Sequence, residues 1–142
     1  MNSIRAARFA AAYALLRSAA DVADHWIQTD HQATTKGLPG VAGREACAAH
    51  VASYVAVQGA ALLGGARLLG IRLRPGPVAA ALALSAVTHY VADRREPLRR
   101  LADATGKGDF ARLADHGMNG SYCLDQAWHH AAETLAALVA SA

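Results

Sequence analysis

Aromatic residues are scarce in this chain: they make up 6% of its 142 residues, although hydrophobic residues as a whole make up 54%, with alanine dominant among them. Runs in which Val, Ile, Thr or aromatic residues alternate with polar residues are also missing, and such alternation is the usual mark of a half-buried strand. These absences exclude a predominantly β protein. They predict helices that pack closely through short side chains.

Cysteine is equally scarce, because the chain has only Cys47 and Cys123 and no CxxC pair. Both lie in segments predicted to be helical, so we expect free thiols in a reducing compartment rather than a disulfide. The N-terminal segment lacks the continuous apolar core of a signal peptide, since Arg17, Asp21 and Asp24 follow within one helix length. We therefore expect a cytoplasmic protein.

A strong charge bias is absent as well. Fourteen Lys and Arg residues against eleven Asp and Glu give a net charge of +3, with a pI near 9.2. This mild excess does not indicate a dedicated nucleic-acid binder, but it is compatible with a small anionic partner. The length is that of one domain, and we predict a single helical domain over residues 1–142 whose core needs no disulfide.

One stretch has no charged residue at all. Residues 46–66 form a 21-residue segment without Asp, Glu, Lys or Arg, which is long enough to span a bilayer. The segment contains His50, Ser53 and Gln58 and many small residues, and these weaken insertion compared with a Leu-rich span. The sequence therefore leaves two interpretations open, a buried helix of a soluble protein and a membrane-associated helix.

Apolar residues at three- and four-residue steps predict a first helix from about Ile4 to about Thr29, with Arg5, Arg8 and Arg17 on its outer side. The fold class predicted is all-α, an antiparallel up-down four-helix bundle with two long connections at one end. The other long helices are predicted over 44–69, 78–93 and 122–140, short helices over 98–104 and 109–115, and the long connections over 30–43 and 94–120.

Carboxylate and imidazole side chains interrupt these apolar helices at four-residue spacing. Asp125 and His129 lie four apart, and so do His89 and Asp93. Residues four apart share one face of a helix, so each pair is expected to project together. The order of the helices places both pairs at the end of the bundle that carries the long connections.

Two further interruptions are expected at the same end. Asp24 and Gln28 lie near the end of the first predicted helix, and His50 lies near the start of the second. Charged and imidazole groups are costly in an apolar bundle unless they pair or bind metal, and bundle metal sites are built from such groups on facing helices. The predicted metal ligands are Asp24, His50, His89, Asp93, Asp125 and His129.

Mixed nitrogen and oxygen ligands fit a divalent Zn, Mn, Fe or Ni ion, in one site or in two adjacent ones. Such an ion would activate a water molecule for hydrolysis. Gln28 and Lys36 are the candidate catalytic residues. Lys36 and Arg44 from the first long connection, or Arg94 and Arg95 from the second, would neutralise a phosphate-containing small molecule. The sequence thus predicts a metal-dependent hydrolase.

The alternative is a non-enzymatic helical module, membrane-associated or a homo-oligomer, in which the same polar groups are structural. Asp and His side chains four residues apart also hydrogen-bond one another across a helical turn. A closed polar network can fix the register of a bundle whose Ala-rich faces specify it poorly.

These motifs together resemble a bacterial and phage family of small helical proteins of unknown function, many of them predicted to lie in membranes. Family members carry H-x-x-x-D-[FH]-x-x-Q near the start, a lone His in the second apolar helix, H-x-x-x-D in the third and L-D-Q-x-x-H in the last. The corresponding segments here are 24–28, His50, 89–93 and 124–129.

The resemblance covers roughly residues 10–140 and implies a phage or mobile-element setting. It implies an arrangement of polar residues and no particular reaction. The first His of the family pattern, four residues before the Asp, falls on Ala20 in this chain, so one polar partner that the family carries is missing.

Overall fold

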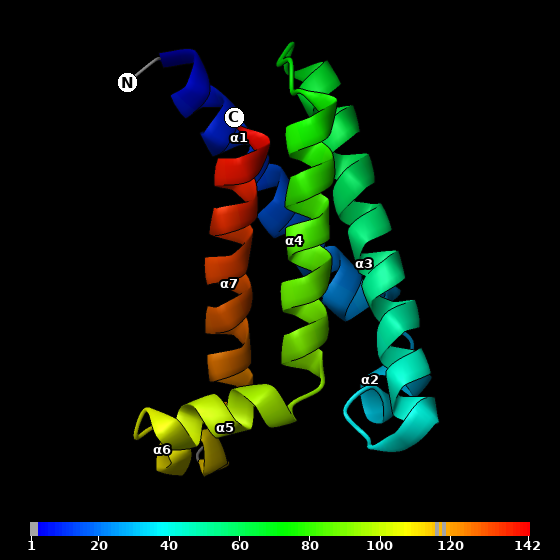
Figure 1. Ribbon diagram of the computed structural model, residues 1–142, viewed down its shortest axis with the longest axis vertical. Helices are drawn as coiled ribbons and strands as arrows, with labels where there is room; N and C mark the ends of the chain where they lie inside the picture. Colours follow the sequence, from blue (N-terminus) through cyan, green and yellow to red (C-terminus); the bar gives the residue numbers. More distant parts are fainter. Residues whose placement is uncertain (1–2, 116, 118) are drawn as a thin grey trace.

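The chain folds into helices throughout the part that its computed structural model describes, which is residues 3–115, 117 and 119–142 (Figure 1). No strand is present in these ranges, so the all-α prediction is confirmed. Positions 1, 2, 116 and 118 of the predicted 1–142 domain lie outside the described residues. The helices are α1 (Ser3–Val22), the π-helical turn η1 (Ala23–Ile27), α2 (Asp30–Thr35), α3 (Gly40–Leu68), α4 (Pro75–Asp93), α5 (Glu96–Ala104), α6 (Gly108–Arg112) and α7 (Gly120–Ala140).

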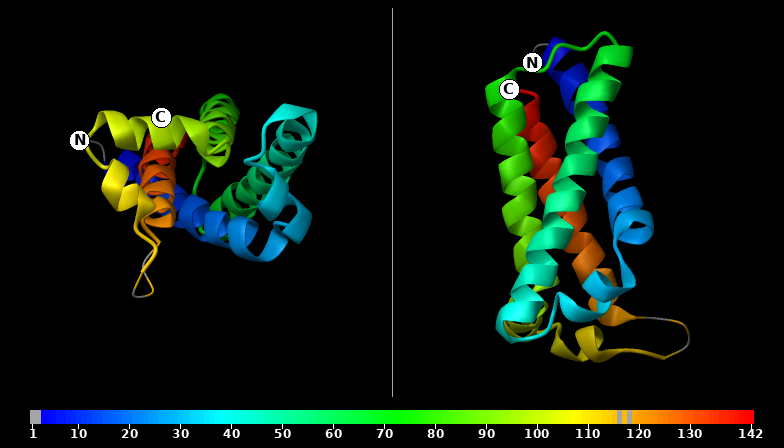
Figure 2. Two further views of the ribbon diagram at one scale, coloured as in Figure 1. Left: turned by 90° about the horizontal axis from the view of Figure 1, so that it is seen from below. Right: turned by 90° about the vertical axis from the view of Figure 1, so that its right-hand side faces the viewer.

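The four long helices pack side by side in a closed ring, because α1 and α4 each contact both α3 and α7. Both chain ends lie at one end of the molecule, and α2, α5 and α6 lie at the other (Figures 1 and 2). The main apolar core lies toward the end with the termini and is built mostly from small side chains, as the composition predicts. Its buried members are Ala12, Leu16, Leu62, Val78, Ala81, Ala136, Ala137 and Ala140.

The first long helix ends earlier than its apolar pattern predicts. The Gln28 N–H donates to the Ala23 carbonyl at 2.9 Å, five residues back, so the last turn is a π-turn. Gln28 itself is extended, with φ −58° and ψ 129°. Turns of this kind widen a helix and occur frequently at functional sites. In this chain η1 contains Asp24 and places it at the end of the helix ring where α2 and α5 lie.

A capping box that the sequence reading missed corrects the predicted first connection. The Thr29 hydroxyl accepts from the Gln32 N–H, and the Gln32 side chain accepts from the Thr29 N–H at 2.9 Å, so α2 begins at Asp30. This reciprocal pair is a strong helix start. The connection 30–43 is therefore largely helical, and α3 begins at Gly40 rather than near residue 44.

The remaining predicted boundaries shift by a few residues. Pro75 occupies the first turn of α4, where its missing N–H has no helical partner to lose, so this helix starts three residues earlier than predicted. Asn119 caps α7 through its side chain, which accepts from the Tyr122 N–H at 3.0 Å, so this helix starts at Gly120. The short helices are found as α5 and α6, although α6 ends at Arg112 instead of near residue 115.

Among the described residues one helix, α3, is long and apolar enough to cross a membrane, with a mean hydropathy of 1.5 in its most apolar window. Core helices of soluble proteins share this property. Cys47 is buried and Cys123 is exposed, and both thiols are free, as the sequence predicted.

The start of α3 is expected to tolerate no side chain at Gly43. A Cβ at this position would overlap the Leu38 carbonyl oxygen, which is backbone and cannot move aside alone. Gly43→Ala should lower the free energy of unfolding by about 2 kcal/mol. Gly64→Ala in the exposed interior of the same helix meets no heavy atom of the described chain and should raise it by about 0.5–1 kcal/mol. Denaturant unfolding of both variants checks this, and equal effects would contradict it.

Candidate metal centre

Four side chains converge where α3, α4 and η1 meet. His50 comes from the first half of α3, His89 and Asp93 from the last turns of α4, and Asp24 from η1. Both imidazoles are almost fully buried, with exposures of 0% and 1%. Asp93 is also buried, and 13% of the Asp24 side chain is exposed. The structure thus brings together residues that are up to 69 positions apart in the sequence.

The Nε2 atoms of both imidazoles face the same point. They lie 3.0 Å from each other. His50 Nε2 lies 3.1 Å from Asp24 Oδ1 and 3.3 Å from Asp93 Oδ2. His89 Nε2 lies 3.4 Å from the same Asp24 oxygen and 3.1 Å from the same Asp93 oxygen. Each nitrogen is therefore within 3.4 Å of the other three atoms.

The ligand atoms of His50, His89 and Asp93 all lie within 4.8 Å of one another, so these three side chains could hold one small cation. Around a tetrahedral ion with bonds of about 2.0–2.1 Å to nitrogen and oxygen, neighbouring ligand atoms lie about 3.3 Å apart. In the absence of an ion, His50 Nε2–H can donate to Asp24 Oδ1 at 3.1 Å and His89 Nε2–H to Asp93 Oδ2 at 3.1 Å.

The electrostatics keep the donors in the form that binds metal. Burial lowers the pKa of His89 below its ordinary value, outweighing the opposing hydrogen bond to Asp93, so this imidazole is neutral. Burial alone would raise the pKa of Asp24, but the hydrogen bond to His50 and the neighbouring imidazoles outweigh it and lower the pKa. His89 and Lys36 hold the pKa of Asp93 far below its usual range, against the effect of burial. Neutral imidazole and ionised carboxylate are the ligating states.

Asp125 and His129, the other predicted pair, lie beside this cluster on α7. His129 Nε2 is 3.4 Å from Asp125 Oδ2. The His129 ring stacks on the His89 ring, with centroids 4.3 Å apart and planes at 26°. Burial opposes a charge on His129, but Asp125 raises its pKa above the ordinary value. All six predicted ligands therefore lie in one cluster.

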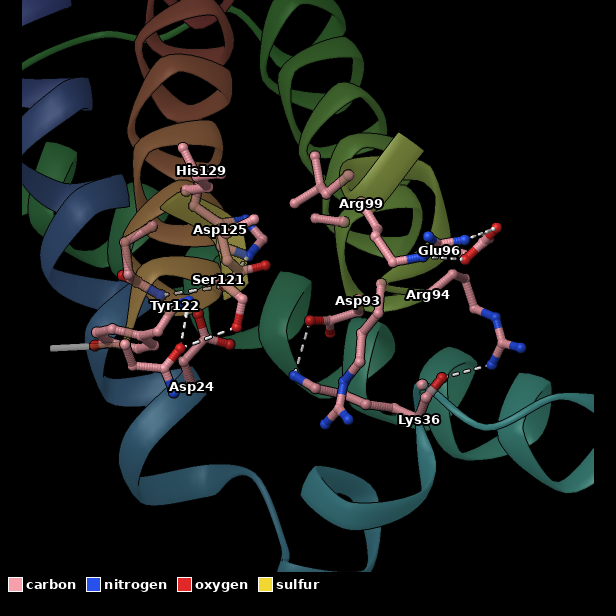
Figure 3. Close-up of a pocket in the computed structure, with 18 of the residues that line it drawn as sticks. Asp24, Lys36, Asp93, Arg94, Glu96, Arg99, Ser121, Tyr122, Asp125 and His129 are labelled. Carbon is pink, nitrogen blue, oxygen red and sulfur yellow. Dashed lines mark hydrogen bonds and ion pairs between the residues drawn. The ribbon is translucent and has the colours of Figure 1, made fainter. Parts of the chain in front are cut away.

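Lys36 reaches the same cluster from the connection after α2. Its Nζ pairs with Asp93 Oδ1 at 2.9 Å, and only 13% of its side chain is exposed. Arg94 holds this connection in place, because its guanidinium donates to the Lys36 carbonyl (Figure 3). It also donates to the Leu38 carbonyl at 2.7 Å. Arg95 donates in the same way to the Ala33 carbonyl at 3.2 Å.

Two of the arginines proposed as phosphate ligands are therefore engaged with backbone carbonyls. The third, Arg44, is exposed and does not line the pocket beside the cluster. Of these four cationic side chains, Lys36 alone contacts a predicted metal ligand through its charged group in the described part of the chain.

A pocket of about 760 Å³ opens beside the cluster, at the end of the molecule that carries α2, α5 and α6. Asp24, Asp93, Asp125 and His129 line it, whereas His50 and His89 lie behind it. Its other walls include the predicted catalytic residues Gln28 and Lys36. Gln28 Nε2 is buried and has no hydrogen-bond partner in the described ranges.

The sequence reading missed a buried polar group next to the cluster. The Tyr54 ring lies 3.8 Å from the His89 ring, and its hydroxyl donates to Glu133 at 2.9 Å. Arg17 donates to both oxygens of Glu133, at 3.0 and 2.9 Å. Arg17 was predicted on the outer side of the first helix, and its inward pairing was missed because Glu133 is 116 residues away. Ala20, where the family pattern has His, is fully buried against Tyr54.

Comparison with protein-family models, with curated proteins and with solved structures gives no match.

Proposed function

We propose that the protein is a metal-dependent hydrolase that acts on a phosphate-containing substrate. The observation that carries the proposal is the position of the His50 and His89 Nε2 atoms, which lie 3.0 Å apart and each within 3.4 Å of one oxygen of Asp24 and one oxygen of Asp93. The donor set suits Zn, Mn, Fe or Ni. A divalent ion held by these residues would supply activation of a water molecule and polarisation of a phosphoryl oxygen.

The residues around the donors support a phosphate-containing substrate. Lys36 places an ammonium group on the pocket wall, 2.9 Å from Asp93. Once a cation shares the charge of Asp93, this ammonium is free to pair with a substrate phosphate oxygen. Gln28 has a buried Nε2 without a partner in the described chain, and it lines the same pocket. We assign it the donation of a hydrogen bond that orients the substrate.

Hydrolysis of small phosphate esters tests this function. Protein loaded in turn with Zn²⁺, Mn²⁺, Fe²⁺ or Ni²⁺ is assayed on p-nitrophenyl phosphate and bis-p-nitrophenyl phosphate. With the active metal, Lys36→Ala should lower kcat/KM by about 10- to 100-fold, since it removes a charge that contacts the substrate. His130→Gln, at an exposed position next to His129, should leave it unchanged. Equal activity of Lys36→Ala and the native chain would contradict the assignment.

We further infer that the four long helices form an antiparallel up-down bundle. The support is the closed ring of helix contacts and the position of α2, α5 and α6 at the end opposite the termini. From the sequence motifs alone, we also propose a relationship to the bacterial and phage family of small helical proteins and its mobile-element setting.

The length and hydropathy of α3 favour a second candidate, a membrane-associated module. The oligomeric form of this alternative, a homo-oligomer, has no separate observation in its favour. Fractionation of expressing cells separates the two settings: the hydrolase proposal is made for a cytoplasmic protein, and recovery only in detergent extracts would favour the membrane-associated module.

A further inference from the structure

His129 is oriented in a way that excludes it from the ion held by His89. The two rings are stacked at 4.3 Å with planes at 26°. An imidazole nitrogen binds a cation through the lone pair in the plane of its ring. Stacked rings present their lone pairs side by side, and the two lone pairs do not converge on one point. An ion in the plane of His89 therefore lies out of the plane of His129, although Asp24, His89 and His129 are close enough together by distance alone.

His129 belongs instead to a second set of donors. Ligand atoms of Asp93, Asp125 and His129 all lie within 4.8 Å of one another. His129 Nε2 and Asp125 Oδ2 are 3.4 Å apart, which is the spacing found among the first four donors. Asp93 belongs to both sets and is buried; its Oδ2 lies 3.3 and 3.1 Å from the two imidazole nitrogens of the first set, and its Oδ1 pairs with Lys36 at 2.9 Å. A carboxylate shared in this way is able to bridge two cations.

The second set differs from the first in its access to the pocket. All three of its members line the 760 Å³ pocket, whereas His50 and His89 of the first set do not. Three protein ligands that face a pocket leave coordination positions for a substrate, which is the pattern of catalytic sites.

The balance of charge favours an anionic substrate for such a pair. Three carboxylates, from Asp24, Asp93 and Asp125, face one ammonium group, from Lys36. One divalent cation makes this group neutral, and a second makes it doubly positive, which suits a phosphate dianion. Two cations about 3.5–4 Å apart form the usual clamp for phosphoryl oxygens in hydrolases.

We propose that Asp93, Asp125 and His129 form a second divalent cation site, which shares Asp93 with the buried site. A phosphate ester in the pocket binds the cation at this second site through one of its oxygens. This inference rests on the proposed function, because the first ion occupies the site of His50 and His89. Asp93 joins the two sites, His129 and Asp125 hold the second ion, and the pocket provides the space for the ester.

Titration with Mn²⁺ alone tests the second site without any assay of activity. Chelator-treated, dialysed protein should bind two Mn²⁺ per chain in equilibrium dialysis and give the spin-coupled electron paramagnetic resonance spectrum of an ion pair. Asp125→Asn/His129→Gln should bind one Mn²⁺, with the affinity of the buried site within about threefold, and should lose the coupled spectrum. His130→Gln is the matched control and should behave as the native chain does.

If the double variant does not fold, the single variant Asp125→Asn replaces it in the titration, because the Asp125 side chain is 27% exposed. It should weaken the second binding event at least tenfold and leave the first unchanged. One Mn²⁺ in the native chain would overturn the second site while leaving the hydrolase proposal in place. Loss of all binding in the double variant would also overturn it, because the pair would then belong to a single site. No Mn²⁺ binding by the native chain would overturn the second site, and failure to bind Zn²⁺, Fe²⁺ and Ni²⁺ as well would also overturn the hydrolase proposal.

Discussion

Asp24→Asn is expected to remove the stabilisation of the fold by the divalent cation at the buried site. A cation that binds only the folded chain stabilises it by about 2.7 kcal/mol at a hundredfold excess over its Kd. Asn keeps the shape of Asp24 but loses its negative charge, which contacts His50 and His89 at 3.1 and 3.4 Å. Structural sites of four ligands bind with about 10–16 kcal/mol, so loss of one ligand should weaken Kd by more than about a hundredfold.

Thermal unfolding with and without Zn²⁺ measures this effect in the native chain and the variant. Each protein is compared with its own metal-free form, so that the hydrogen bond lost between Asp24 and His50 does not enter the comparison. Asp30→Asn, at an exposed position in the first turn of α2, is the control and should keep the full metal-dependent shift. If the unfolding temperature of the native chain does not change with Zn²⁺, the result would favour a purely structural role for the Asp and His cluster.

Arg17→Ala is expected to cost about 3 kcal/mol of stability near neutral pH, because it leaves Glu133 as a buried carboxylate without its ion pair. Burial already raises the pKa of Glu133, against the opposing effects of Arg17 and Tyr54. Without Arg17 this pKa rises further. A raised pKa in the folded state means that stability is greatest when the group is protonated and falls as pH rises. The deficit of the variant should therefore shrink as pH is lowered.

The double variant Arg17→Ala/Glu133→Gln separates charge from packing. A neutral amide at position 133 still accepts the Tyr54 hydrogen bond and carries no charge to be buried, so the double variant should recover at least half of the loss. Denaturant unfolding at several pH values provides the measurement. A loss that is independent of pH and equal in the double variant would instead assign the effect to lost packing of the Arg17 side chain.

The proximity of the six proposed ligands could be predicted from the sequence, because the geometry of an α-helix is regular. Four-residue spacing puts His89 and Asp93, or Asp125 and His129, on one helix face, and the order of the helices puts them at one end. Their role as ligands remains a prediction. The all-α class followed in the same way from composition and periodicity.

Features that depend on long-range contacts were not accessible. The π-turn at Ala23–Ile27 interrupts an apolar pattern that continues through it, so the pattern alone predicts a straight helix. The use of Arg94 to hold the Lys36 connection depends on a contact across 58 residues. The stacking of His129 on His89, from which we infer two sets of donors, depends on how α4 and α7 pack.

The metal content of the protein purified without chelator tests the central claim most directly. Inductively coupled plasma mass spectrometry on freshly purified chain should find at least one equivalent of Zn, Mn, Fe or Ni. That metal should be lost from His50→Ala, which removes a proposed ligand with no exposed surface. Native protein that contains no stoichiometric metal, and that takes up none on titration with these four ions, would contradict the account.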